Sequence, residues 1–243
     1  MPEIVYEAHV DHAKVDRTGR WNSGMLLTSA AIGVLLAVGL AVAVIAGLGW
    51  FTITIASLGV AACAVSVLLA SRRRRALGLL VTDDDVAVAV ETEGIRLAGA
   101  PLIPWTEIVF VGVLDDRARS ARVQDLPFSG PLARATVRSG SATLLCEIGV
   151  RDGEALRRAF AGARGADRVT LFDRFDGTRR GLIPLMLDAV IDDATALQAA
   201  QVLIREAERR GIPARSFTKV FAYFEWKGPM IDLKWPVEKK GIA

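Results

Sequence analysis

The sequence predicts an α+β protein: a two-helix transmembrane hairpin, then an antiparallel β domain and a small ββαββ extension. Two observations lead to this prediction. Residues 21–71 contain no Asp, Glu, Lys or Arg, although these residues make up 23% of the 243-residue chain. Beyond residue 75, apolar and polar residues alternate over several short runs, which is the period of half-buried β-strands. The chain therefore combines a membrane segment with a segment of soluble composition.

Two helices are expected within the charge-free run, over residues 25–47 and 51–70. At 1.5 Å per residue, each crosses a hydrocarbon core of about 30 Å, whereas one continuous helix would be about twice that length. The sequence Gly47-Leu48-Gly49-Trp50 interrupts the run and gives the backbone freedom to turn. A cleaved signal peptide is the alternative, and it is disfavoured because the apolar region is about twice the usual length.

The positive charge predicts the orientation of this hairpin. Four consecutive arginines follow the second helix, and the turn between the helices carries no charge. By the positive-inside rule, a tail of residues 1–20 and the C-terminal part both lie in the cytoplasm, which makes a two-pass protein of the cytoplasmic (inner) membrane. Residues 76–243 hold 23 basic and 23 acidic side chains, so the net charge of +3 indicates no nucleic-acid partner.

Residues 76–165 are expected to form mostly β-structure. Valines at 86, 88 and 90 alternate with alanines, and a long apolar run follows. The expected order is two strands around a turn at 92–94, a strand over 102–114, a loop to 131, a hairpin of 133–139 with 143–150, and a helix capped by Asp152.

Residues 166–243 are expected to form a second unit. Its strands are predicted at 169–175 and 182–187, around a turn at 176–178. Asp193 is the predicted cap of a helix over 194–210, which Gly211 and Pro213 end. Two apolar runs, 218–226 and 231–235, are expected to close the unit as a terminal hairpin.

One segment carries a resemblance to a known family. Glu93-Gly94-Ile95 and Ile103-Pro104-Trp105-Thr106-Glu107-Ile108, followed by the expected hairpin and helix, resemble the bacterial membrane-anchored pleckstrin-homology-like (PH-like) domain proteins. The resemblance covers residues 76–165 and the helical hairpin. It implies a bent antiparallel sheet, a capping helix near 156–160 and Trp105 in the core. It also implies a binding or scaffolding module without catalytic residues; residues 166–243 are then a second copy or a different module.

The sequence contains few residues in patterns typical of catalytic, metal-binding or phosphate-binding sites. The two histidines, His9 and His12, flank Asp11 in the tail, but a zinc site needs three or four ligands. Glycine-rich phosphate-binding loops are absent from the sequence. The pair Asp115-Asp116 stands where a strand ends, as turn residues do. We therefore expect no enzyme activity, no metal and no cofactor.

Two sets of side chains are candidate contact sites. The arginines are candidate lipid-headgroup contacts, with a topology signal and a solvated loop as the alternatives: Arg72, Arg73, Arg74, Arg75, Arg117, Arg119 and Arg122. The aromatic residues of the tail are a candidate partner surface, with cover inside the same domain as the alternative: Phe221, Tyr223, Phe224, Trp226 and Trp235.

The expected function is that of a non-catalytic membrane-anchored cytoplasmic scaffold or accessory subunit of a membrane protein complex. Its expected partners are the lipid bilayer and other membrane proteins or a second copy of the chain, as a homo-oligomer. Two alternatives remain open. One is an enzyme acting on a membrane-embedded or phosphorylated substrate, with Asp115, Asp116 and the nearby arginines as its site. The other is a sensor of anionic lipid surfaces.

Overall fold

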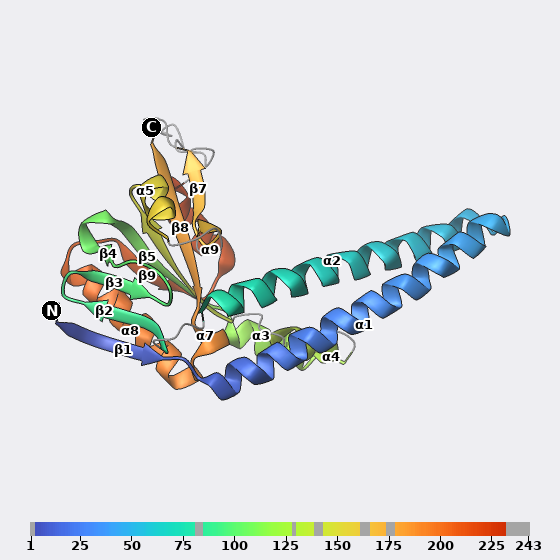
Figure 1. The fold of residues 1–243 in the computed structure, drawn as a ribbon, viewed down its shortest axis with the longest axis horizontal. Helices are drawn as coiled ribbons and strands as arrows, with labels where there is room; N and C mark the ends of the chain where they lie inside the picture. Colours follow the sequence, from blue (N-terminus) through green and yellow to red (C-terminus); the bar gives the residue numbers. More distant parts are fainter. Residues whose placement is uncertain are drawn as a thin grey trace, which may run out of the picture.

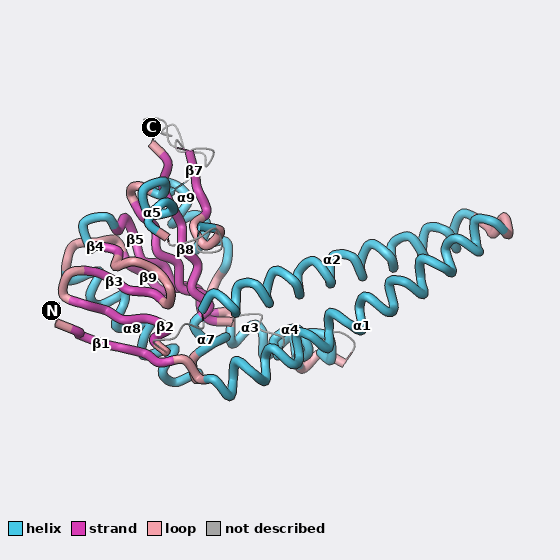
Figure 2. Tube along the Cα trace, viewed as in Figure 1, coloured by secondary structure: helices cyan, strands magenta, loops and turns pink. Residues whose placement is uncertain are grey.

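The computed structural model describes residues 3–80, 85–127, 130–138, 143–160, 166–173 and 178–231. It is an α+β structure in which two long helices extend from a body built on two β-sheets (Figure 1). The strands all lie at one end of the molecule, and the far end of the hairpin holds the two helices and the turn between them (Figure 2). The α+β class, with two long apolar helices followed by β-sheets, is therefore as predicted.

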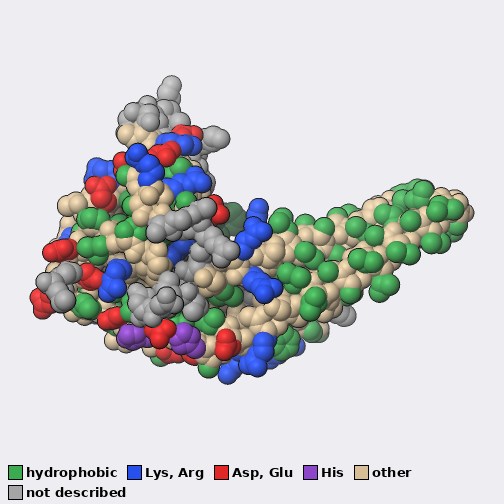
Figure 3. Space-filling view, in the orientation of Figure 1, with side chains coloured by type: hydrophobic (Ala, Val, Ile, Leu, Met, Phe, Trp, Pro, Cys, Tyr) green, Lys and Arg blue, Asp and Glu red, His purple; other side chains and the backbone are tan. Residues whose placement is uncertain are grey.

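The hairpin consists of α1 (His12–Ile45) and α2 (Trp50–Leu80). Both helices are long and apolar enough to cross a membrane, and their outer part is covered by hydrophobic side chains (Figure 3). The chain turns at residues 46–49, where Gly47 adopts a φ of +66°, so the predicted break is confirmed. Both helices are longer than the predicted spans. Toward the sheets, they include the charged residues on either side of the charge-free run.

The first sheet contains residues from both sides of the hairpin. Its four strands are antiparallel and lie in sequence order: β1 (Ile4–His9), β2 (Val86–Glu91), β3 (Gly94–Leu97) and β4 (Ile103–Pro104). Tyr6 of β1 lies opposite Val90 of β2. Because β1 precedes α1 and β2 follows α2, the helical hairpin is inserted between two hydrogen-bonded strands.

The second sheet draws strands from both halves of the remaining chain. Its order is β7 (Thr170–Asp173), β8 (Arg179–Met186), β6 (Leu144–Val150), β5 (Ile108–Asp115) and β9 (Ala214–Phe217). Neighbouring strands are antiparallel except β5 and β9, which are parallel. Residues 76–165 and 166–243 therefore share one sheet. A 3₁₀ turn, η1 (Trp105–Glu107), leads from β4 into β5.

Two helices, α5 (Gly153–Ala159) and α8 (Asp193–Arg209), follow the sequence pattern closely, whereas the short α7 (Leu187–Val190) was not predicted. Asp152 caps α5 as predicted, through a bond from the Ala155 amide. The short α7 leads to α8, whose cap is Asp192 rather than the predicted Asp193. The buried face of α8 is rich in alanine, with Leu203 fully buried, so the helix packs closely on β1, β5 and β9.

Two predictions for residues 117–139 are wrong. The expected loop contains α3 (Arg117–Gln124), and the expected strand at 133–139 is the helix α4 (Gly130–Arg138). β6 consequently pairs with β5 and β8 instead of closing a hairpin. Ala133, Ala135 and Val137 alternate as in a strand, but Ala133, Thr136 and Val137 are also spaced i, i+3, i+4. This second spacing gives α4 a half-buried face, and the helix contacts α1.

The predicted terminal hairpin is wrong as well, since α9 (Val220–Ile231) is a helix. Its second strand, predicted at 231–235, lies outside the described residues beyond Ile231. A helix places Tyr223, Trp226 and Lys227 on one face, whereas a strand would put Tyr223 and Trp226 on opposite faces. That face packs on β5 at Gly112, where a Cβ atom would lie only 2.6 Å from the Tyr223 ring.

The resemblance to PH-like proteins stays a prediction. The implied core position of Trp105 is present, because its ring is 7% exposed and its Nε1 donates to the Glu91 carbonyl at 3.0 Å. The helix at the implied place, α5, contacts β7 and β8. A buried tryptophan and a packed helix are compatible with many α+β folds, so they establish the class and not the family.

Replacing Gly112 with alanine should destabilise the packing of α9 on the second sheet. The added methyl group forces the Tyr223 ring away from β5, and overpacking of this kind costs about 2 kcal/mol, or roughly 4–8 °C in apparent Tm. Thermal unfolding of the full chain in mild detergent measures the change. Gly19→Ala is the matched control, because no atom lies within 4 Å of its Cβ position; an equal fall in both variants would contradict the packing argument.

Candidate functional site

A pocket of about 450 Å³ lies where the hairpin joins the sheets. Four elements form it: the start of α1, the end of α4, the residue that opens β6 and the segment around α7. The side chains that give it chemical character are Lys14, Arg17, Trp21, Arg138, Thr143 and Asp188. The three from α1 are spaced i, i+3, i+7 and so share one face of the helix.

The pocket lies where α1 changes from charged to apolar. Trp21 opens the charge-free run, and the Arg138 guanidinium carbon lies 5.3 Å from the centre of its ring. The next residue, Asn22, is fully buried against α2, where its Nδ2 donates to the Ala70 carbonyl at 2.9 Å. This bond sets Trp21 beside the end of the charge-free part of α2. Figure 3 shows basic side chains gathered at this base of the hairpin.

Both signs of charge line the pocket. Lys14 is already engaged, since its Nζ donates to the Ile191 carbonyl at 2.8 Å and lies 2.6 Å from Asp193 Oδ1. Asp188 is half engaged: its Oδ2 accepts bonds from the amide and the hydroxyl of Thr143, at 2.7 and 2.6 Å. Its Oδ1 is buried and has no hydrogen-bond partner among the described residues. Because this oxygen has almost no accessible surface, a molecule in the pocket does not reach it, and the Asp188 charge acts on Arg117, whose pKa it helps Asp115 to raise.

The candidate headgroup arginines fall into two groups. Arg72, Arg74 and Arg75 are exposed on α2, Arg73 is half-buried there, and Arg119 and Arg122 are exposed on α3. Arg117 instead forms a bidentate pair with Asp115, in which Nε lies 2.8 Å from Oδ1. The hydrogen bonds from Arg117 hold the pKa of Asp115 below its ordinary value. Arg117 is thus a structural partner, whereas Arg72, Arg74 and Arg75 are exposed where a membrane surface could meet them.

Exposed apolar side chains accompany these arginines. Val123, Leu126 and Leu132 on and between α3 and α4 are 36%, 51% and 68% exposed. The α3 and α4 helices lie beside the sheet end of the hairpin, and α4 contacts α1 (Figure 1). Sequence reasoning did not find this surface, because it treated the segment as a loop and a strand. An amphipathic spacing over residues 130–138 was the available signal.

The candidate partner surface on α9 is smaller than expected. Tyr223 is 1% exposed, and Trp226 packs edge-on against Phe110 with ring centres 5.5 Å apart. Phe221 and Phe224 are exposed, at 85% and 40%, and Trp235 lies outside the described residues. Among the members of this surface that the structure describes, Phe221 and Phe224 are thus the exposed ones.

A buried polar cluster holds α9 in place. The Tyr223 hydroxyl and the Lys227 ammonium both donate to Oε2 of Glu147 on β6, and all three side chains are buried. Burial, with the nearby charge of Glu147, raises the pKa of Tyr223. The cluster satisfies its own members and lies beneath α9, which suits a structural role.

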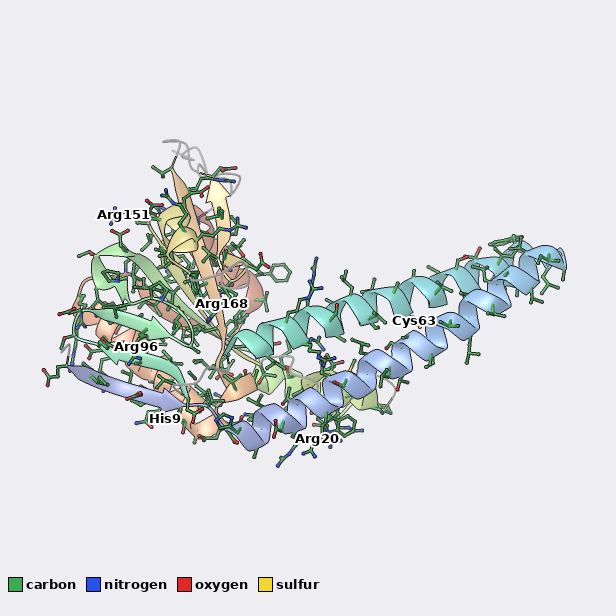
Figure 4. All side chains as sticks on the ribbon, in the orientation of Figure 1. His9, Arg20, Cys63, Arg96, Arg151 and Arg168 are labelled. Atoms are coloured by element: carbon green, nitrogen blue, oxygen red, sulfur yellow. The ribbon has the colours of Figure 1, made fainter. Side chains whose placement is uncertain are left out.

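The described residues show little that suits nucleophilic or metal chemistry. Burial raises the pKa of Cys146 to about 12, which leaves the unreactive thiol at neutral pH. Cys63 lies on the hairpin, far from the sheets, and His9 lies at the end of β1 (Figure 4). His12 Nε2 lies 2.8 Å from Asp85 Oδ1. Within the described ranges, no three His, Cys, Asp or Glu side chains lie close enough to hold a metal ion.

No family model, curated protein or solved structure matches this chain. Function is therefore inferred from the pocket and from the way the hairpin joins the sheets. The pocket is lined by basic and aromatic side chains of α1 and α4 and by acidic side chains at α7 and the start of α8. The exposed arginines of α2 and α3 and the exposed leucines at 126 and 132 suit contact with a membrane surface.

Removing one member of the buried cluster should be more damaging than removing two. Glu147→Leu leaves the Lys227 ammonium buried without a counter-ion, at a cost of about 3–5 kcal/mol. The double variant Glu147→Leu, Lys227→Met leaves no unpaired charge and should recover more than half of that loss. Chemical denaturation of the full chain in mild detergent gives the free energies of unfolding. Lys227→Met alone completes a double-mutant cycle. If the double variant lost as much free energy of unfolding as the two single variants together, the pairing of Glu147 with Lys227 would be contradicted.

Proposed function

We propose that this chain is a membrane-anchored cytoplasmic scaffold or accessory subunit of a membrane protein complex, acting by binding rather than by catalysis. The observation that carries the proposal is the insertion of the helical hairpin between β1 and β2. A domain tethered by one flexible linker is free to tumble at the membrane surface. Here both ends of the anchor are strands of the same sheet, so the anchor and the sheet keep one relative orientation.

Contacts at the start of α1 support this rigid joint. The Asp11 amide donates to the Val190 carbonyl at 2.8 Å, and the Asp11 carboxylate caps the helix by accepting from the Lys14 amide. Lys14 in turn reaches the Ile191 carbonyl, so the carbonyls of the last residue of α7 and of the residue after it are both held by the start of α1 and its cap. The Val10 amide donates to the Asp85 carbonyl, which joins the two ends of the hairpin directly.

The charge pattern supports an orientation with the sheets in the cytoplasm. Arg72, Arg74 and Arg75 are exposed on α2 beside the sheets, while the turn at residues 46–49 is uncharged. The bidentate pair of Asp115 with Arg117 supports a structural role for those residues over the alternative of a catalytic one. The proposed partners are membrane proteins or further copies of the same chain, met through the spans or the sheets.

Labelling of single cysteines tests the orientation. In a Cys63→Ser background, a Gly49→Cys variant in intact cells should react with a membrane-impermeant maleimide, because the turn faces outward. An Arg75→Cys variant should react only after the membrane is permeabilised. The buried Cys146 is present in every variant, so any labelling of it is a constant background signal. The reverse pattern of labelling would place the sheets on the other side of the membrane.

Insertion of a flexible segment tests the scaffold proposal. Six Gly and Ser residues inserted between Val10 and Asp11 uncouple β1 from α1 while leaving both spans intact. We expect a protein that co-purifies stoichiometrically with the full chain in mild detergent to be lost or reduced at least fivefold. The same six residues inserted after Gly47 are the control, because that turn lies at the far end of the hairpin. A co-purifying protein that is equally retained by both variants would show that the joint does not matter, and the absence of any such protein or oligomer would overturn the proposal.

A further inference from the structure

We propose that the α3–α4 segment, residues 117–127 and 130–138, is a second membrane contact. It sets Leu126 and Leu132 at the boundary of the bilayer that holds the hairpin, and its arginines bind anionic lipid headgroups. This inference rests on the proposed membrane anchoring, which brings the segment to the bilayer. It goes beyond the scaffold role because it names a surface and commits it to one partner, the lipid layer around the hairpin.

The α3–α4 segment is a preformed unit. Its two helices are held together where they meet, because Arg134 Nη1 donates to the Gln124 carbonyl at 3.1 Å. A Cβ atom on Gly130 would lie only 2.3 Å from that carbonyl oxygen, so glycine permits the close approach. The bidentate pair of Arg117 with Asp115 fixes the start of the segment to β5. A surface built in this way has little chain to order when it binds.

The contact of α4 with α1 places the segment at the level where α1 enters the bilayer. Arg138, the last residue of α4, lies over the Trp21 ring, where the charge-free run of α1 begins. α4 packs on α1, and the loop between α3 and α4 lies farther along the hairpin than the sheet end of α4 (Figure 2). At 1.5 Å per residue, the first residue of α4 lies about 12 Å from Arg138. The start of α4 therefore lies beside the charge-free part of α1, which is the part suited to hydrocarbon.

The exposed apolar side chains of the segment match that level. Val123, Leu126 and Leu132 are all exposed, Leu132 the most at 68%. The other exposed large apolar side chains that the structure describes outside the hairpin and its turn lie on β1 and α9. One exposed leucine is ordinary in a soluble protein, whereas several on one segment beside a membrane span indicate a contact. Apolar side chains in this position enter the boundary between headgroups and acyl chains.

The charges of the segment favour anionic headgroups. At its start, Arg117 pairs with Asp115, and Arg119 lies 4.0 Å from Asp116. The remaining exposed charged side chains of the segment are three arginines and one aspartate: Arg122, Arg134, Arg138 and Asp125. An excess of positive charge beside a bilayer attracts anionic lipids. Arginine also keeps its charged group among the headgroups while its stem lies along apolar groups.

Quenching of a fluorescent dye by lipid tests the contact. The dye is attached to a Leu126→Cys variant of the full chain, in a Cys63→Ser background. The chain is reconstituted in vesicles of phosphatidylcholine and phosphatidylglycerol that contain lipids spin-labelled at several depths. Ile4→Cys is the matched control, because Ile4 is 50% exposed against 51% for Leu126, and β1 starts at the end of the molecule opposite the hairpin turn (Figure 1). We expect quenching at position 126 to be at least about threefold that at position 4; equal quenching would overturn the proposal.

Removal of charge tests the preference for anionic lipid. The double variant Arg122→Gln, Arg138→Gln should lower quenching at position 126 at least about twofold, toward its value in vesicles of phosphatidylcholine alone. Arg157→Gln, Arg158→Gln on α5 is the matched control, because both arginines are exposed and Arg158 bonds to the carbonyl four residues earlier, as Arg122 does. Thermal unfolding checks that both variants are folded. Quenching that is the same in both kinds of vesicle would show that anionic lipid is not recognised, and would overturn the proposal.

A dye on the hairpin separates this proposal from the membrane anchoring on which it rests. Leu35 lies in the charge-free part of α1 and is 72% exposed, so a Leu35→Cys variant reports whether the hairpin is in the bilayer. Quenching at position 35 without quenching at position 126 would leave the anchoring intact and refute this contact, and quenching at neither would refute both. Failure of the scaffold proposal is read separately, because it concerns co-purified protein and these vesicles contain none.

Discussion

The pairing of β1 with β2 is the constraint on which the rest of the molecule depends. The chain enters and leaves a helical hairpin at the same end. The axes of two packed helices lie about 8–10 Å apart, whereas two hydrogen-bonded strands lie about 4.8 Å apart. The bond from the Val10 amide to the Asp85 carbonyl joins the two sides at the start of the hairpin. Any tilt of α1 must therefore move the first sheet, since only Val10 and Asp11 separate β1 from α1.

The second sheet is tied to this joint through Trp105. Its indole donates to the Glu91 carbonyl of β2, and the turn in which it stands leads into β5. Arg210, after α8, lies over the indole ring at 4.4 Å and pairs with the buried Glu206. The helix α8 also contacts β1 and β5, one strand from each sheet. The two sheets and the anchor are thus linked by buried contacts, and the resulting body is suited to present one surface at a fixed angle to a membrane.

Sequence reasoning succeeded where one pattern was far stronger than its rivals. The charge-free run and its glycine turn identified the hairpin, and the capped, alanine-rich pattern identified α8. It failed at α4 and α9. Their short apolar runs fit both the two-residue period of a strand and the 3.6-residue period of a helix, and contacts with distant parts of the chain decide between the two. For α9 the deciding contacts are Gly112 and Glu147, which no local pattern reveals. The pocket was out of reach for the same reason, since Trp21, Arg138 and Asp188 meet only through the tertiary fold, although the juxtamembrane arginines were visible.

The pocket lies at the joint itself, because Arg17 belongs to α1, Arg138 to α4 and Asp188 to α7. Anything that changes the angle between the anchor and the sheets therefore changes this pocket. A molecule or partner that bound there would favour the orientation to which it binds more tightly, by the general rule for ligands and conformational states. The contacts between α1, α7 and the first sheet would pass that preference on to the sheets.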